Sequence, residues 1–362
     1  MKKAVKAALL PSVTIACSLY GMGTAYAQSS VTLYGLIDES LNYVSNEGGH
    51  SAFTQTSGNV QGSRWGFKGT EDLGGGYQAI FTLENGFALN NGALGQGGLE
   101  FGRQAFVGLA TPAGTITLGR QYDFLIYLYS MTNLFNAGTY GFHLGDYDRL
   151  GGERLNNVIA YQSPTFGGLK VGVLYAPGGQ PGHLAAGSAQ SYGISYSRDN
   201  LNLAAAYTSV NNTTITPAAT IGVPDLFGTP QVGTIALNRI STVAAGGSYK
   251  FGPALLHGVY SLTDMKSGNS TAVLSTWEGG VTYWLTPAVS VLGGYAYSKL
   301  NEAHWGQYMV SADYFLSKRT DLYALLNYEH VHGDDVRATL FTATPSSGGN
   351  QTIVSLGIRH RF

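Results

Sequence analysis

Few side chains in this sequence have the types and spacing needed for catalysis or ligand binding. The two imidazoles of His330-Val331-His332 could ligate a metal ion, but they stand where a strand is expected to give way to a loop. No third ligand is indicated. The LGGG stretch at 73–76 lacks the following helix and the Lys-Ser/Thr pair of a phosphate-binding loop. No Gly-x-Ser-x-Gly or His-Glu-x-x-His motif occurs. The sequence therefore predicts no catalytic residue, no metal site and no cofactor.

Basic side chains alternate with aromatic ones in the stretch SRWGFKGTEDLGGGYQAIFTLENGF at 63–87. Arg64 and Lys68 share one parity, whereas Trp65 and Phe67 share the other. Successive residues of a strand point to opposite faces, so each run makes a ribbon with a polar and an apolar side. The function of Arg64 and Lys68 therefore depends on whether the polar or the apolar side of these strands faces the interior of the protein.

The first 27 residues are predicted to be a secretory signal peptide. A lysine-rich start precedes a largely apolar stretch at 7–20, and Ala25-Tyr26-Ala27 is a small-x-small cleavage site. The apolar stretch is too short and wrongly flanked for a membrane-spanning helix. We expect cleavage after Ala27 and a mature chain, residues 28–362, that forms a single domain.

Cys17 is the only cysteine, and it leaves with the signal peptide. A lipoprotein would carry its lipid on this residue, but Thr14 stands where such a site needs an aliphatic side chain. Without a cysteine, the exported chain has no disulfide, thiol chemistry or cysteine-based metal site. The signal peptide removes 3 of the 20 basic residues, so the mature charge is 17 − 21, or −4, which argues against nucleic-acid binding.

The composition is typical of β-structure whose surroundings are not simply water. The chain has 51 glycines and 24 tyrosines, and only 11% of its residues are charged, against about 25% in soluble domains. No segment of the mature chain has the roughly 20 continuous apolar residues of a membrane helix.

One unit recurs from Val31 to Phe362: an alternating run, a short turn, a second alternating run and a longer polar stretch. Seven short and eight long connections predict sixteen strands, with all tight turns at one end of an up-and-down meander. The short connections lie at 71–76, 111–115, 166–168, 198–200, 251–254, 285–288 and 317–320. The long ones centre on 46–62, 88–99, 125–155, 177–189, 211–239, 266–272, 301–306 and 334–349.

The strands indicate which side faces inwards. They run ten residues or more, and their apolar faces carry Tyr, Phe, Ala and Gly; Met309 and Leu325 break the alternation. A tilted strand of about 9–11 residues crosses a bilayer, and a closed barrel leaves no unpaired edge in lipid. We therefore expect an all-β transmembrane antiparallel up-and-down barrel, apolar outside and polar inside. Sixteen strands leave an aqueous channel.

The two ends of the mature chain fit this interpretation. In the last stretch, NQTIVSLGIRHRF, apolar residues occupy alternate positions, including Leu356 and Ile358, and Phe362 comes last. This pattern resembles the assembly signal of outer-membrane barrels. We expect residues 31–35 to pair with this last strand and close the cylinder.

Several segments together resemble the Gram-negative general-diffusion porins, of the sixteen-stranded trimeric type found in β-proteobacteria such as the neisserial porins. The matching segments are VTLYGLID (31–38), SRWGFKGTEDLGGG (63–76), FGRQAFVGL (101–109), GTITLGRQYD (114–123), RLNNVIAYQSPTFGGL (154–169), LSKRTDLYA (316–324) and GIRHRF (357–362). The resemblance implies an outer-membrane homotrimer with periplasmic short turns and external long loops. Its implied partners are lipid, lipopolysaccharide, the barrel-assembly machinery, and small hydrophilic solutes and ions.

The resemblance also implies a pore constriction. The third long connection, residues 125–153, is rich in aromatic residues and would fold into the lumen, which places three acids in the pore: Asp146, Asp148 and Glu153. The facing basic wall would contain Arg64, Arg103 and Arg154. Parity supports Arg64 and adds Lys68. Arg120 would join them only if its strand has already ended.

The sequence therefore predicts a water-filled channel for passive diffusion, not an enzyme. The arginines favour weak anion selectivity, although the acidic mature chain works against it. Two alternatives stay open at this point. The first is an outer-membrane barrel hydrolase, and the second is an exported soluble β-sandwich that binds glycans.

Overall fold

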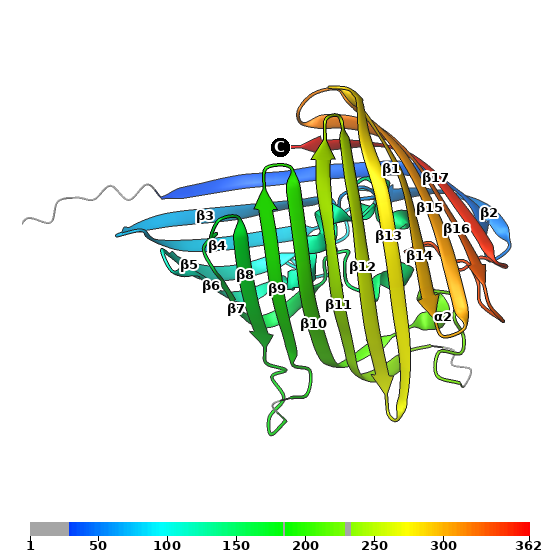
Figure 1. The fold of residues 1–362 in the computed structure, drawn as a ribbon, viewed down its shortest axis with the longest axis horizontal. Coiled ribbons are helices and arrows are strands. Elements are labelled where there is room, and N and C mark those ends of the chain that lie inside the picture. The colour runs from blue at the N-terminus through cyan, green and yellow to red at the C-terminus, as the bar shows by residue number, and fades with distance from the viewer. Residues whose placement is uncertain (1–28, 184, 229–232) are drawn as a thin grey trace, which may run out of the picture.

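The fold is one antiparallel sheet closed into a cylinder (Figure 1). The computed structural model describes residues 29–183, 185–228 and 233–362. The predicted signal peptide and its cleavage site at Ala27 lie outside the described residues. Within the described ranges, no helix is long and apolar enough to cross a membrane.

Strands make up most of the described chain, and the helices are short. The strands are β1 Ser30–Glu47, β2 His50–Ser57, β3 Arg64–Gly74, β4 Tyr77–Gly86, β5 Gln104–Thr111, β6 Gly114–Tyr122, β7 Arg154–Gln162, β8 Leu169–Ala176, β9 Ala189–Arg198, β10 Leu201–Ile215, β11 Ile235–Phe251, β12 Ala254–Ser267, β13 Ser270–Thr286, β14 Val289–Leu300, β15 Ala303–Phe315, β16 Thr320–His332 and β17 Asn350–Arg361. The helices are η1 Phe124–Met131, α1 Leu134–Ala137, η2 Thr139–Gly141, η3 Leu144–Asp146 and α2 Pro217–Thr220.

The seventeen strands occupy sixteen positions around the cylinder. β2 and β3 lie end to end along one edge of β1, where β2 pairs with residues 39–47 and β3 with residues 30–36. Residues 58–63 leave the wall between them. The predicted sixteen-stranded barrel is therefore confirmed, with one strand position interrupted.

The barrel closes a few residues later along β1 than predicted. Residues 36–44 pair with β17, whereas residues 30–36 pair with β3. Within the segment 31–35, Gly35 exchanges backbone hydrogen bonds of 3.1 and 3.0 Å with Phe362, the residue that follows β17. Closing a barrel requires neighbouring strands to be staggered, so the first residues of β1 extend past the end of β17.

Three predicted long connections are tight turns instead. Only residues 48–49, 268–269 and 301–302 separate the strands at these places. Gly48, Gly268 and Asn301 have φ values of 61°, 56° and 53°, which suit two-residue hairpin turns. The polar residues that were expected to form loops belong to strands instead. These strands extend beyond the apolar outer surface of the barrel. There both of their faces are polar, so an apolar/polar alternation no longer indicates a strand.

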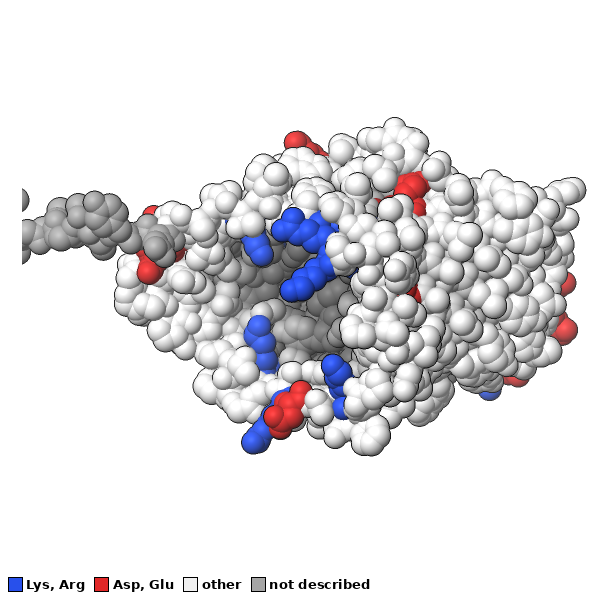
Figure 2. Space-filling model, turned by 90° about the horizontal axis from the view of Figure 1, so that it is seen from above, with Lys and Arg blue, Asp and Glu red and all other residues white. Residues whose placement is uncertain are grey.

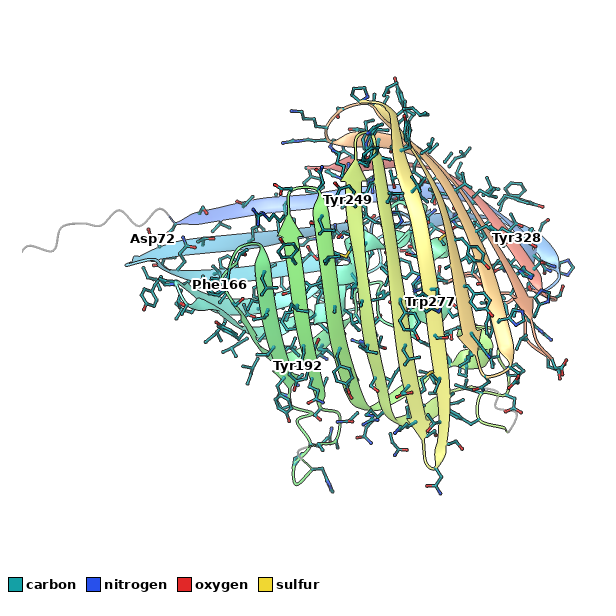
Figure 3. All side chains as sticks on the ribbon, viewed as in Figure 1. Asp72, Phe166, Tyr192, Tyr249, Trp277 and Tyr328 are labelled. Atoms are coloured by element: carbon teal, nitrogen blue, oxygen red, sulfur yellow. The ribbon has the colours of Figure 1, made fainter. Side chains whose placement is uncertain are left out.

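The outer face of the cylinder is apolar, as predicted. Tyr308, Val310 and Tyr314 on β15 are each about half exposed, and Leu322 and Leu326 on β16 are nearly so. Labelled aromatic side chains on β9, β11 and β13 project from the same face (Figure 3). Large apolar groups at alternate positions over the whole circumference suit contact with lipid.

The inner face is not uniformly polar, because a long segment packs against it. Residues 123–153, here called the inner loop, lie inside the cylinder (Figure 1). Phe124, Leu125 and Leu128 form one buried cluster with small inward residues of β7–β12 such as Ala204 and Ala244. The sheet therefore holds the inner loop against one half of the wall and leaves space on the other.

Candidate functional site

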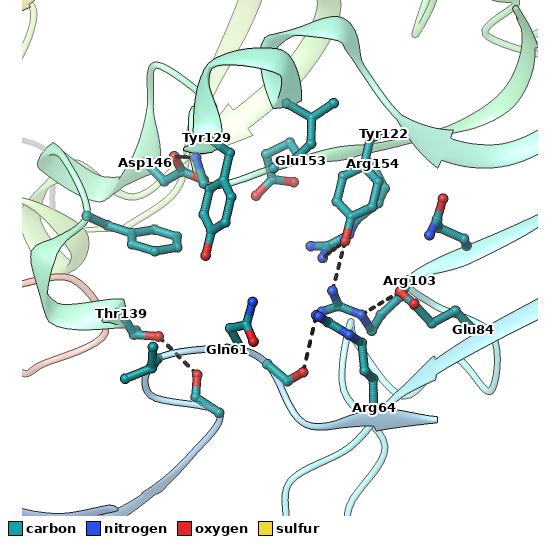
Figure 4. A pocket seen from close by; sticks show the side chains of 18 of the residues that line it. Gln61, Arg64, Glu84, Arg103, Tyr122, Tyr129, Thr139, Asp146, Glu153 and Arg154 are labelled. Carbon is teal, nitrogen blue, oxygen red and sulfur yellow. Dashed lines mark hydrogen bonds and ion pairs between the residues drawn. The ribbon is translucent and has the colours of Figure 1, made fainter. Parts of the chain in front are cut away.

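A cavity of about 470 Å³ lies between the inner loop and the wall formed by β3–β6 (Figure 4). Three arginines and three acids line it: Arg64, Arg103, Arg154, Glu84, Asp146 and Glu153. Tyr34, Tyr122 and Tyr129 also line it, together with Phe142 and Phe341. Viewed from above relative to Figure 1, the molecule has a hollow with Lys and Arg side chains around it (Figure 2).

The three arginines meet because each one stands where the chain enters the wall. Arg64 begins β3 after the inward excursion at 58–63, and Arg154 begins β7 directly after the inner loop. Arg103 precedes β5 by one residue. These entries lie at the same level of the cylinder, so side chains far apart in sequence line one cavity.

A tyrosine and a glutamate accept hydrogen bonds from two of the cavity arginines and hold them in place. The Tyr122 hydroxyl accepts hydrogen bonds from Arg103 Nη2 at 2.9 Å and from Arg154 Nη2 at 2.7 Å. Arg103 Nε also donates to Glu84 Oε1 at 2.8 Å, and the Tyr34 hydroxyl donates to Glu84 Oε2 at 2.9 Å. These bonds fix Arg103 and Arg154 facing the cavity.

Arg64 is held more loosely. Its Nη1 has one long contact of 3.5 Å to the Gly62 carbonyl oxygen, and its guanidinium lines the cavity. A cation with one weak contact keeps most of its hydrogen-bonding capacity for water or a passing solute.

Two residues predicted for the basic wall do not line this cavity. Lys68 is exposed further along β3, with its Nζ 5.6 Å from the centre of the Tyr34 ring. Arg120 bonds the Gly102 carbonyl at 2.7 Å and Asn156 Oδ1 at 2.5 Å. β6 continues to Tyr122, so the strand has not ended at Arg120, although its register with β7 shifts between Gly119 and Gln121.

The predicted acids divide into two groups. Asp146 and Glu153 line the cavity, whereas Asp148 does not, because it is fully buried against the wall. Burial raises the pKa of Asp146 well above its usual value, and the negative charges of Glu153 and Asp148 add to the effect. Where Asp146 is protonated, the three arginines of the cavity share it with two other acids, Glu84 and Glu153.

Asp148 belongs to a buried network that fastens the inner loop to the wall. His143 Nδ1 contacts Asp148 Oδ2 at 2.6 Å, and His143 Nε2 contacts Glu278 Oε2 on β13 at 2.8 Å. Ser261 Oγ on β12 donates to the same Asp148 oxygen at 2.6 Å. Both neighbouring carboxylates raise the pKa of His143 well above its ordinary value despite its burial. We call these residues and Asn133 the wall latch.

Asn133 joins the wall latch at a second point of the loop. Its backbone N–H donates to Glu278 Oε1 at 2.7 Å, and its side-chain Oδ1 is 2.8 Å from His257 Nε2 on β12. Glu278 therefore uses one oxygen for His143 and the other for Asn133. A single wall carboxylate holds two parts of the inner loop.

Sequence reasoning missed several members of this site. Glu84 had a usable signal, since it shares the polar side of the alternating run that follows the Gly-rich turn. Tyr122, His143 and Glu278 had none, because their roles arise from contacts between distant segments. Among the described residues, no three or more His, Cys, Asp or Glu side chains are already in position to bind a metal.

Sequence comparison identifies the family. The family model described as Gram-negative porin matches residues 13–335. The chain is 30% identical to an outer membrane porin protein of Bordetella pertussis, over 94% of this chain and 96% of the relative. It is also 30% identical to outer membrane porin protein 32 of Delftia acidovorans, over 99% of this chain and 100% of that protein. Major outer membrane protein P.IB of Neisseria gonorrhoeae is 26% identical, over 88% of this chain and 91% of that protein.

Solved structures agree with this result. An anion-selective porin from Comamonas acidovorans superposes with a TM-score of 0.77 and 27% identity, covering 92% of this chain and all of that one. The trimer form of OmpT from Vibrio cholerae shares the fold, with a TM-score of 0.67 at 15% identity. Neither a hydrolase nor a soluble sandwich is supported, and the chain belongs to the Gram-negative porins of the outer membrane.

Proposed function

We propose that this porin conducts small hydrophilic solutes and ions by passive diffusion, with a weak preference for anions and no enzymatic activity. The observation that carries the proposal is the cavity wall formed by Arg64, Arg103 and Arg154. The solved relative described as anion-selective supports the same preference.

The preference follows from the balance of charges in a narrow space. Glu84 is paired with Arg103 and bonded to Tyr34, so it attracts passing cations weakly. Arg64 and Arg103 lie across the cavity from the acids of the inner loop, whereas Arg154 directly follows Glu153 (Figure 4). Fixed charges in a narrow, low-dielectric passage are screened less than in bulk water, so an excess of cationic groups favours anions.

Processing and assembly complete the proposal. Cleavage after Ala27 releases residues 1–27 and leaves residues 28–362 as one barrel domain. Leu356, Ile358 and Phe362 lie on the outward face of the last strand, where the assembly machinery can reach them. The OmpT structure described as a trimer form supports a homotrimer. We expect the apolar outer face of the barrel to contact outer-membrane lipid and lipopolysaccharide.

A planar-bilayer recording tests the channel itself. Purified protein should insert in steps, and each step should give an ohmic current. A bilayer that stays silent with folded protein would contradict channel activity. In a KCl gradient, a reversal potential of cation-selective sign would show that the proposed preference is wrong.

A further inference from the structure

Three histidines gather on the outer face of β15 and β16, away from the pore. His304 is the second residue of β15, and His330 and His332 lie at the end of β16. His304 pairs directly with His332 across the two strands, and His330 shares their face because it stands two residues earlier. The ring centre of His332 lies 5.0 Å from that of His304 and 4.3 Å from that of His330.

Two of these rings already turn their nitrogens towards one point. Nε2 of His330 lies 2.6 Å from Nε2 of His332. Two neutral imidazoles can approach this closely only if one donates its N–H to the lone pair of the other. Two protonated rings would repel each other. Converging imidazole nitrogens are also the arrangement in which a metal ion is bound.

The cluster lies where an ion from solution can reach it. β15 begins after the turn at 301–302, and β16 ends at the connection 333–349, so the histidines stand at the loop end of the cylinder. His332 is exposed, and the other two are partly exposed. Tyr328, next along the outward face of β16, projects from the barrel (Figure 3). The histidines therefore lie beyond the outward aromatic residues of these strands.

We propose that His304, His330 and His332 form a binding site for a divalent transition-metal ion of the zinc class. Imidazole nitrogen suits Zn²⁺, Cu²⁺ and Ni²⁺, whereas Mg²⁺ and Ca²⁺ prefer oxygen ligands. Two nitrogens bound to a tetrahedral zinc ion at about 2.0–2.1 Å are about 3.3 Å apart, so the two facing nitrogens must separate by roughly 0.7 Å. His304 must turn its ring towards them to supply the third nitrogen, and water fills the remaining positions.

This site differs from the sequence-based expectation, which found no third ligand near His330-Val331-His332. The third imidazole comes from the neighbouring strand, and only the register of β15 against β16 places it there. A bound metal would join two strands at the loop end of the barrel. It would leave the cavity between the inner loop and β3–β6 unchanged.

Zinc titration of the folded chain tests the proposal. Chelator-treated protein in detergent is titrated with Zn²⁺ by calorimetry, and we expect a single saturable site per chain. The double variant His330→Gln, His332→Gln should bind at least about tenfold more weakly. His304→Gln should lie between the double variant and the unaltered chain, because it removes one nitrogen of three.

A matched variant separates this site from other histidines. His50→Gln removes an exposed imidazole at the start of β2 and should bind Zn²⁺ like the unaltered chain. Single-channel conductance of each variant shows that the barrel has folded. Absence of saturable binding by the unaltered chain would overturn the proposal, and so would unchanged affinity of the double variant.

Discussion

The two sides of the inner loop use similar charged groups for different purposes. On the side facing β3–β6, Asp146 and Glu153 line a cavity together with Arg64, Arg103 and Arg154. On the side facing β12 and β13, the wall latch joins His143 and Asp148 to Glu278, and none of these three side chains is more than 1% exposed. The first side is open to passing ions, and the second is closed to them.

The difference shows that burial decides what a charge does here. A charge beside water-filled space acts on mobile ions, because its field is not fully compensated by a partner. A buried ion pair contributes little net stability, yet removing one partner is costly because the other is left uncompensated. We therefore expect the cavity side to set selectivity and the latch side to set the position of the loop.

Breaking the wall latch should have the largest effect. Glu278→Ala removes the acceptor for both His143 and the Asn133 N–H, at a cost of about 3–5 kcal/mol. The inner loop should then leave the wall, and single-channel recordings should show a changed, noisier conductance. The folded barrel should also unfold at a lower temperature, as followed by its mobility in electrophoresis.

The control for this variant is Glu71→Gln, which changes an exposed carboxylate on β3. It should leave the conductance, the noise and the unfolding temperature unchanged. A quiet channel of normal conductance from folded Glu278→Ala protein would show that the latch does not hold the loop.

Removing cations from the cavity side should have the next largest effect. Arg64→Gln should shift the reversal potential in a KCl gradient towards cations, and adding Arg154→Gln should shift it further. Arg198→Gln serves as the control, because the Arg198 side chain is 70% exposed at a tight turn. If Arg64→Gln gives no shift, Arg64 lies outside the constriction.

The pH dependence of selectivity should be smaller and should depend on Asp146. Because its pKa is raised well above the usual value, this acid stays neutral at pH values where ordinary aspartates are charged. As the pH rises through that pKa, a negative charge appears in the cavity and anion selectivity should weaken. Asp146→Asn should abolish this change in reversal potential, whereas an equal change in the variant would assign it to another group.

The Tyr122 hydroxyl should make the smallest contribution. Tyr122→Phe removes the acceptor shared by Arg103 and Arg154 but leaves both charges in place. The loss of hydrogen bonds to charged groups costs roughly 1.5–3 kcal/mol each at most. We expect a modest change in conductance with the sign of the reversal potential preserved. Reversal of that sign would mean that arginine orientation matters as much as arginine charge.

The sequence predicts the barrel well because lipid requires a two-residue period. Tyr308 and Leu326 lie on the predicted outer face, and the strand number is confirmed. The two residues that broke the alternation are also informative. Met309 packs with Ala137 of the inner loop, and Leu325 packs with Val60 of the excursion after β2. Interruptions of the pattern therefore mark where inward segments touch the wall.

The site is less predictable because it depends on contacts between distant segments. The resemblance placed Arg103 and Arg154 on the basic wall, and the structure places both at the cavity. Alternation alone could not reveal that Asp148 turns to the wall, or that Tyr122 faces two arginines. His304 and His332 likewise become neighbours only through strand register.

The most direct test is to record Glu278→Ala and the double variant Arg64→Gln, Arg154→Gln in the same bilayer system under a KCl gradient. Our interpretation predicts that the first changes conductance and noise most, whereas the second chiefly moves the reversal potential towards cations. If the arginine variant keeps the original reversal potential while the latch variant alone reverses it, the division of roles between the two sides of the inner loop is wrong.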